Sequence, residues 1–76
     1  MSAHAGALEA VERIVNRGGE ASDVRDAVTG VLRERLGFTT RFEDGGLVIV
    51  AGPDEPTAAD RATLDRVALL TSPYVG

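Results

Sequence analysis

The sequence predicts a small α+β domain with the order helix, helix, strand, strand, helix. Three observations lead to this fold class. Apolar residues recur at helical spacing in three segments, alternate with polar residues in a fourth, and run without interruption through a fifth. Turns that contain glycine or proline separate the segments. We therefore expect two layers, with helices packed on an antiparallel two-stranded hairpin that dimerisation extends or covers.

The first helix is expected to begin at Ala7, after a flexible tail of residues 1–6, so that residues 7–74 form one domain. Gly18 and Gly19 are expected to end this helix, because glycine readily adopts the left-handed conformation. One helical face is apolar and is expected to be buried; it is formed by Leu8, Val11, Ile14 and Val15.

The second helix is expected to be capped by Ser22 or Asp23 and to end at Gly37. Gly30 lies inside it, which costs about 1 kcal/mol relative to alanine. Two interpretations stay open: Gly30 is a tolerated weakness, or Ala27 and Gly30 together allow another helix or the sheet to approach closely. The apolar stripe consists of Val24, Ala27, Val28, Val31, Leu32 and Leu36.

The period then changes to that of a hairpin. Phe38, Thr40 and Phe42 alternate with polar residues, as in a half-buried strand. Asp44-Gly45-Gly46 is typical of a hairpin turn. The second strand is expected over residues 47–51, before Gly52-Pro53, and it is apolar throughout. The residues expected to face the helices are Leu47, Ile49 and Ala51.

The last helix is expected to begin after Thr57, which has capping-box spacing to Asp60. Ser72-Pro73 is expected to end it. Tyr74 is either a polar group at an interface or a half-buried anchor of the chain end, and both interpretations stay open. The inward stripe is predicted to contain Leu64, Val67, Ala68 and Thr71.

Val48 and Val50 are left on the hairpin face that points away from the helices. A two-stranded hairpin is marginally stable alone and has two open edges. We expect a second copy of the chain to form a homodimer that covers it, by continuing the sheet, by burying this face, or through a shared helical bundle. The alternative is a monomer whose helices wrap enough of the hairpin. The candidate partner-binding residues are Val48, Val50, Ala27, Gly30 and Tyr74.

Composition argues against most catalytic chemistry. The 76 residues include no cysteine and one histidine, His4, near the start of the chain. We therefore expect no enzyme activity and no catalytic, cofactor-binding or metal-ligating residues, and we interpret Asp54-Glu55 as a solvated turn. The net charge of −4 opposes nucleic-acid binding. No apolar run approaches the roughly 20 residues that cross a membrane, so a cytoplasmic protein is expected.

Three stretches resemble parts of GAF domains. Residues 8–16 resemble the entry helix of that family, residues 18–37 the helix before its first strand, and residues 57–70 its last helix. GAF domains hold their ligands between a larger central sheet and segments inserted in the middle of the domain. Here two strands lead directly into the final helix, so those segments are missing. No ligand-binding residue of the family therefore has a counterpart in this chain.

The resemblance implies that a dimer-forming helical surface is retained, because the first and last helices of signalling GAF proteins commonly pack into a bundle between protomers. The expected function is therefore a non-catalytic, dimerising interaction or regulatory module that resembles a pocketless GAF domain, with a possible role in signal transduction. The alternative is a small-molecule sensor, which would hold an apolar ligand at the dimer interface or in a cleft lined by Phe38, Phe42, Leu47 and Ile49.

Overall fold

The elements follow the predicted order. The computed structural model describes residues 2–43 and 46–75. Within these ranges there are three helices and one antiparallel hairpin, which confirms the α+β class with ααββα order. The elements are α1 (Ala3–Arg17), α2 (Ala21–Leu36), β1 (Thr39–Glu43), β2 (Gly46–Ala51), α3 (Ala58–Thr71) and a short 3-10 helix (Ser72–Tyr74).

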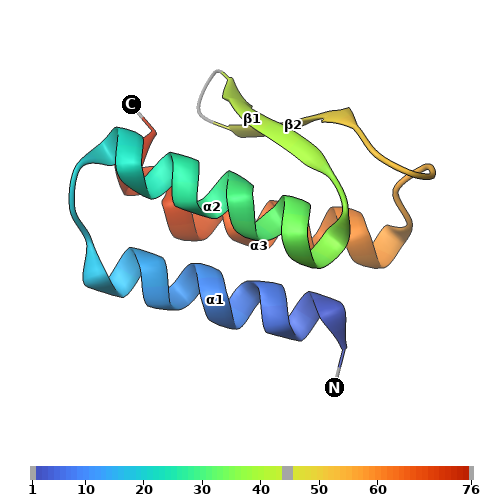
Figure 1. The fold of residues 1–76 in the computed structure, drawn as a ribbon, viewed down its shortest axis with the longest axis horizontal. Coiled ribbons are helices and arrows are strands. Elements are labelled where there is room, and N and C mark those ends of the chain that lie inside the picture. Colours follow the sequence, from blue (N-terminus) through green and yellow to red (C-terminus); the bar gives the residue numbers. More distant parts are fainter. Residues whose placement is uncertain (1, 44–45, 76) are drawn as a thin grey trace.

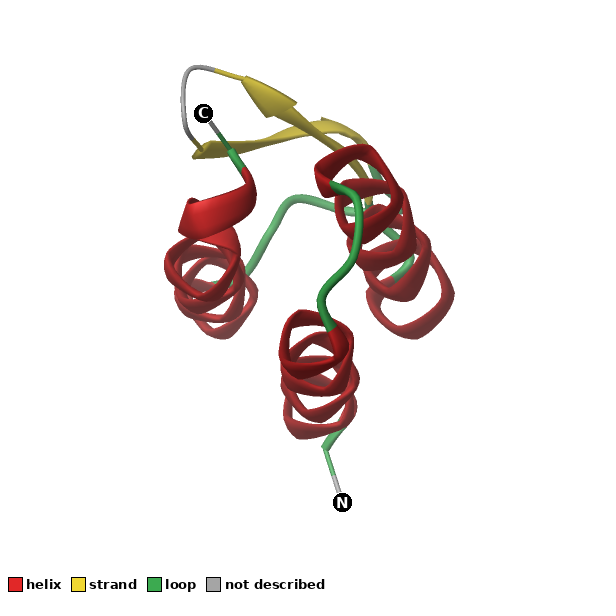
Figure 2. Ribbon diagram, turned by 90° about the vertical axis from the view of Figure 1, so that its left-hand side faces the viewer, coloured by secondary structure: helices red, strands yellow, loops and turns green. Residues whose placement is uncertain are grey.

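The hairpin forms one layer and the helices form the other. Seen nearly end-on, the three helices lie at the corners of a triangle, and the hairpin crosses α2 and α3 on the side away from α1 (Figures 1 and 2). β1 packs on α2, β2 packs on α3, and α1 contacts both of these helices. The helices consequently cover one face of the hairpin and leave the other uncovered.

The core lies between the three helices and beneath the hairpin. Its buried cluster comes from the predicted helical stripes and consists of Val11, Ile14, Val24, Val28, Leu32, Leu64 and Val67. Phe42, Leu47 and Ile49 of the hairpin pack against it. One stripe prediction is wrong: Ala27 is exposed. It lies about 100° around α2 from Val28, beyond the edge of the buried face.

α1 begins four residues earlier than predicted, so residues 3–6 are helical rather than a flexible tail. Ser2 is the N-cap, and its Oγ accepts a hydrogen bond from the Ala5 backbone N–H at 3.1 Å. Serine is among the strongest N-cap residues, which explains the early start. Ala7 is fully buried, so it lies within the packed part of the helix rather than at its start.

α2 also begins earlier than predicted. Its N-cap is Glu20, with no side-chain capping bond, so the prediction of a cap at Ser22 or Asp23 is wrong. Asp23 lies instead in the first turn, where the positive end of the helix dipole stabilises its carboxylate. The predicted glycine ends are confirmed: Gly18 caps α1 at φ 72°, and Gly37 caps α2 in the left-handed region at φ 79°.

The hairpin register places Phe42 opposite Leu47 and Thr40 opposite Ile49 on the inner face. The register then shifts, so that Thr39 pairs with Ala51. An extra residue in one strand reverses which face the following residues occupy. Ala51 is therefore exposed, and the prediction that it faces the helices is wrong. The predicted turn at Asp44-Gly45-Gly46 includes residues 44 and 45, which lie outside the described residues.

α3 is built as predicted at both ends. Thr57 and Asp60 form a capping box: the Asp60 N–H donates to Thr57 Oγ1 at 3.1 Å, and the Thr57 N–H donates to Asp60 Oδ2 at 2.8 Å. After Thr71 the chain tightens into the 3-10 helix. The predicted inward stripe is confirmed: Leu64, Val67 and Thr71 are buried, and Ala68 is half-buried.

Two glycines provide a matched test of this packing. A Cβ on Gly52 would lie 2.5 Å from Cδ1 of the buried Phe38, whereas a Cβ on Gly30 meets nothing within 4 Å. We expect Gly52→Ala to lower the free energy of unfolding by about 1–3 kcal/mol, because Phe38 must shift. Gly30→Ala should raise it by about 1 kcal/mol through helix propensity. Urea denaturation at low protein concentration measures both, and a tolerated Gly52→Ala would contradict the Phe38 packing.

Candidate interaction surfaces around the hairpin

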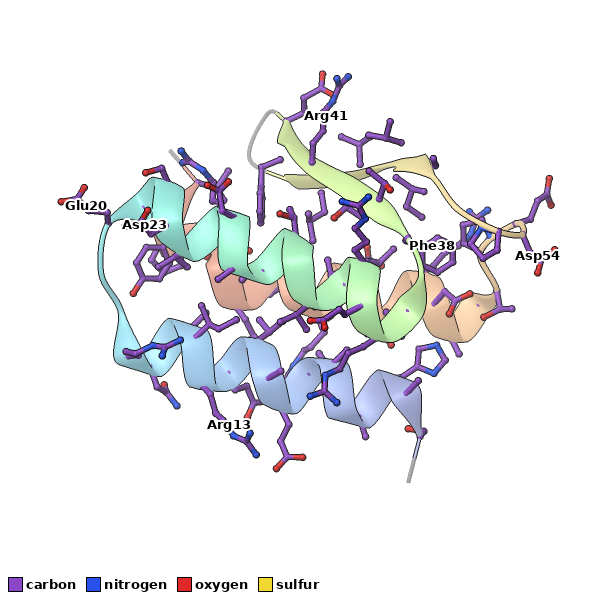
Figure 3. All side chains as sticks on the ribbon, viewed as in Figure 1. Arg13, Glu20, Asp23, Phe38, Arg41 and Asp54 are labelled. Carbon is purple, nitrogen blue, oxygen red and sulfur yellow. The ribbon has the colours of Figure 1, made fainter. Side chains whose placement is uncertain are left out.

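The uncovered side of the hairpin carries exposed apolar side chains. Val48 and Val50 are 41% and 56% exposed, and Arg41, the cross-strand neighbour of Val48, points away from the helices (Figure 3). Arg41 Nε lies 2.7 Å from Glu43 Oε2. We call this surface the hairpin outer face, and it consists of Arg41, Glu43, Val48, Val50 and Ala51. Two β-branched apolar residues lie there beside a single ion pair.

Both edges of the hairpin are also open. Within residues 2–43 and 46–75 the sheet contains only β1 and β2. In an antiparallel pair, alternate residues of each strand direct their backbone N–H and C=O groups toward the outer edge. β1 and β2 therefore each present unpaired backbone groups beside the helix on which they pack.

A groove of about 300 Å³ lies between β2 and α3. Leu47, Ile49 and Leu64 form its apolar part, and Pro56, Arg61 and Asp65 line the rest together with Val48. The expected ligand cleft thus occurs only in part. Phe38 is buried against Gly52 and Phe42 packs on the core, so neither lines the groove. The volume is at the lower limit of small-molecule pockets.

A second groove, of about 380 Å³, lies between β1 and α2. It is lined by Asp26, Thr29, Gly30 and Arg33 of α2, and by Thr39 and Thr40 of β1. Thr40 is only 7% exposed, and its Oγ1 has no hydrogen-bond partner among the described residues. An unsatisfied buried hydroxyl costs about 1–3 kcal/mol. The sequence contained a signal for it, a polar residue at the inward position between Phe38 and Phe42.

The predicted partner-binding residues separate into three places. Val48 and Val50 lie together on the hairpin outer face. Ala27 and Gly30 are exposed on α2, and apart from the local backbone of α2 and the two neighbouring residues, nothing lies within 4 Å of a Cβ placed on Gly30. The close approach suggested for this pair is therefore not made within the described part of the chain.

Tyr74 lies apart from both surfaces and anchors the chain end. Its hydroxyl donates to the backbone oxygen of Val15 on α1 at 3.2 Å. Arg25 of α2 donates to the Tyr74 backbone oxygen at 2.9 Å. Of the two open interpretations, the geometry therefore supports the half-buried anchor.

A histidine–aspartate contact joins the starts of α1 and α3. His4 Nε2 lies 2.6 Å from Asp60 Oδ1, and the side chains are 33% and 15% exposed. The hydrogen bond with His4 and the backbone N–H of Thr57 hold the pKa of the Asp60 carboxyl below its usual value of 3.8. Sequence reasoning missed this contact because His4 was assigned to a flexible tail.

In this geometry the His4–Asp60 pair holds the starts of α1 and α3 together. Both carboxylate oxygens of Asp60 are occupied, one by His4 and one by the cap of its own helix. The nearby Ser2 hydroxyl accepts the capping bond of α1. Asp54 and Glu55 are exposed on the connection before α3, and Asp54 is labelled there in Figure 3. Residues 2–43 and 46–75 contain no group of three side chains suited to hold a metal ion.

In comparisons with known proteins, no family model, no curated protein and no solved structure matches the chain. The resemblance to GAF domains thus stays a prediction that rests on the helical sequences. In the described part of the chain, none of the helices combines the length and apolarity needed to span a membrane.

The pKa of Asp60 predicts how its contribution to stability depends on pH. Because the folded-state pKa is lowered, the stabilisation is present above the unfolded-state pKa of about 3.9 and is lost as the pH falls through the lower folded-state value. We expect Asp60→Asn to destabilise the protein at pH 7 and to match the unmodified chain in strong acid. Urea denaturation across this pH range measures the difference. Asp65→Asn, at an exposed position of the same helix, is the control for the loss of one carboxylate from α3 at pH 7.

Thr40 provides a test of the polar groove. We expect Thr40→Val to raise the free energy of unfolding by about 1 kcal/mol, because it replaces an unsatisfied buried hydroxyl with a methyl group of similar size. Thr39→Val, at the exposed neighbouring position, should change it by less than about 0.5 kcal/mol. Chemical denaturation at low protein concentration measures both. A clear loss of stability in Thr40→Val would show that the hydroxyl already has a partner.

Proposed function

We propose that the chain is a non-catalytic, cytoplasmic interaction module that self-associates as a homodimer and serves a regulatory or signalling role. The observation that carries the proposal is the hairpin outer face. Val48 and Val50 lie two positions apart in β2 and are about half exposed, on a layer that the chain's own helices cover from one side only.

The size of the domain supports an external cover. A domain of this length buries only about 60% of the surface that its unfolded chain exposes, so its stability is marginal. Apolar side chains that stay exposed to water add nothing to that stability. An exposed apolar strand with an open edge also invites uncontrolled pairing. A second copy that buries the outer face would protect the strand and add core to both domains.

The arrangement of residues on the outer face suits a two-fold contact between copies. In an isologous interface the same patch meets itself. Val48 and Val50 can then pack on their counterparts at the centre, with Arg41 and Glu43 at the rim, where charged residues are tolerated. The helices α1 and α3, which resemble the dimer helices of GAF domains, stay available for a regulatory partner.

The variant Val48→Asp tests the proposal. It brings the like-charged carboxylates of the two copies together at the centre of the two-fold contact, so the dissociation constant of the dimer should rise by a factor of about 100 or more. Light scattering behind size exclusion measures the mass over a range of concentrations. The monomer should keep its fold, because Val48 does not belong to the buried cluster.

Leu69→Asp is the matched control, because Leu69 is 70% exposed on α3. We expect this variant to associate like the unmodified chain. If Val48→Asp left the dissociation constant unchanged while Leu69→Asp raised it, the contact would be helical and the proposed outer-face dimer would be wrong.

A further inference from the structure

We infer that the groove between β1 and α2 is a second self-association surface, in which α2 of one copy packs antiparallel against α2 of another. The contact lies on a different side of the domain from the hairpin outer face. Together, two isologous contacts would join dimers into larger assemblies, which close as tetramers when the two two-fold axes are perpendicular and intersect.

The groove presents one continuous stripe of α2. Asp26, Thr29, Gly30 and Arg33 are spaced at i, i+3, i+4 and i+7, which places them on one helical face. This face lies away from the buried stripe of Val24, Val28 and Leu32. It is therefore free to meet another helix.

The charges on this stripe are self-complementary. Asp26 and Arg33 lie about 10 Å apart along α2, on either side of Thr29 and Gly30. When two such helices pack antiparallel about a two-fold axis at Thr29 and Gly30, Asp26 of each copy faces Arg33 of the other. Two symmetry-related ion pairs result. Within the described residues, neither side chain takes part in an ion pair of its own chain.

Small residues allow the helices to approach at the centre. A Cβ on Gly30 would meet nothing within 4 Å other than the local backbone of α2 and the two neighbouring residues, and the nearby Ala27 is exposed. Thr29 turns its hydroxyl back to the Asp26 backbone oxygen at 3.0 Å, which leaves its methyl group for contact. Glycine in the middle of a helix costs stability in the isolated domain. At position 30 it would allow the second helix to approach closely.

The wall of the groove opposite α2 is formed by β1. Thr40 lines the same groove from β1, and its Oγ1 lacks a partner in the described chain. The two-fold axis lies normal to the plane of the paired helices, so β1 of both copies lies on the same side of the interface.

A small anionic or cationic ligand fits the groove less well. Asp26 repels an anion, Arg33 repels a cation, and both charges are exposed at the ends of the stripe. A second copy satisfies both charges at once, without further components.

Charge reversal tests the contact in 76-residue chains that carry Val48→Asp, which removes the outer-face contact. Asp26→Arg and Arg33→Asp should each raise the dissociation constant about tenfold, because both ion pairs become like-charge contacts. An equimolar mixture of the two variants, or the double variant, should restore association. Glu12→Arg and Arg66→Asp are exposed controls with the same changes in net charge and should have no effect.

A cross-linking measurement gives the same test without Val48→Asp. The chain has no cysteine, so Thr29→Cys introduces a single thiol beside the proposed axis. Mild oxidation should convert it to a covalent dimer much faster than it converts Glu12→Cys on α1. Both positions lie on the helix surface.

The outcomes separate this inference from the proposed function. Charge reversal without effect, a mixture that fails to restore association, or equal cross-linking of the two cysteine variants would overturn the α2 contact. The outer-face dimer would be unaffected by those results. If Val48→Asp changed nothing while charge reversal dissociated the protein, the outer face would fail and the α2 contact would stand.

Discussion

The structure depends on one constraint: three helices cover only one face of a two-stranded hairpin. Val11, Val28, Leu32 and Val67 fill the space between the helices, and Phe42, Leu47 and Ile49 close it from above. Nothing in the described chain then remains for the other face, although β2 is apolar on both sides. The proposed self-association follows from this imbalance rather than from any catalytic or ligand-binding chemistry.

The ends of the elements are secured by local polar contacts. Asp60 links two of them, because its carboxylate caps α3 through Thr57 and contacts His4 at the start of α1. Tyr74 and Arg25 perform a comparable task at the other end, where they attach the end of the chain to α1 and α2. These contacts fix the helical triangle from both ends, and the hairpin packs on the platform that results (Figure 2).

Periodicity predicted the element order, the helical core stripes and the inward alternation of Phe38, Thr40 and Phe42. It failed where local geometry or tertiary contacts decide the outcome. Ala51 turned outward because the hairpin register shifts near Thr39, which no alternation pattern reveals. His4 belongs to a helix because Ser2 caps it and Asp60 lies nearby. The sequence also predicted Val48 and Val50 on an uncovered face, but the α2 groove required the contact between β1 and α2 to be known.

The absolute mass of the unmodified chain in solution tests the central claim most directly. Light scattering behind size exclusion, over a series of dilutions, compares that mass with the 7.9 kDa of one chain. The account predicts at least twice this mass at high concentration, with a fall toward one chain on dilution. A mass of one chain at every concentration would contradict it, and would mean that the hairpin outer face is stable in water without a second copy.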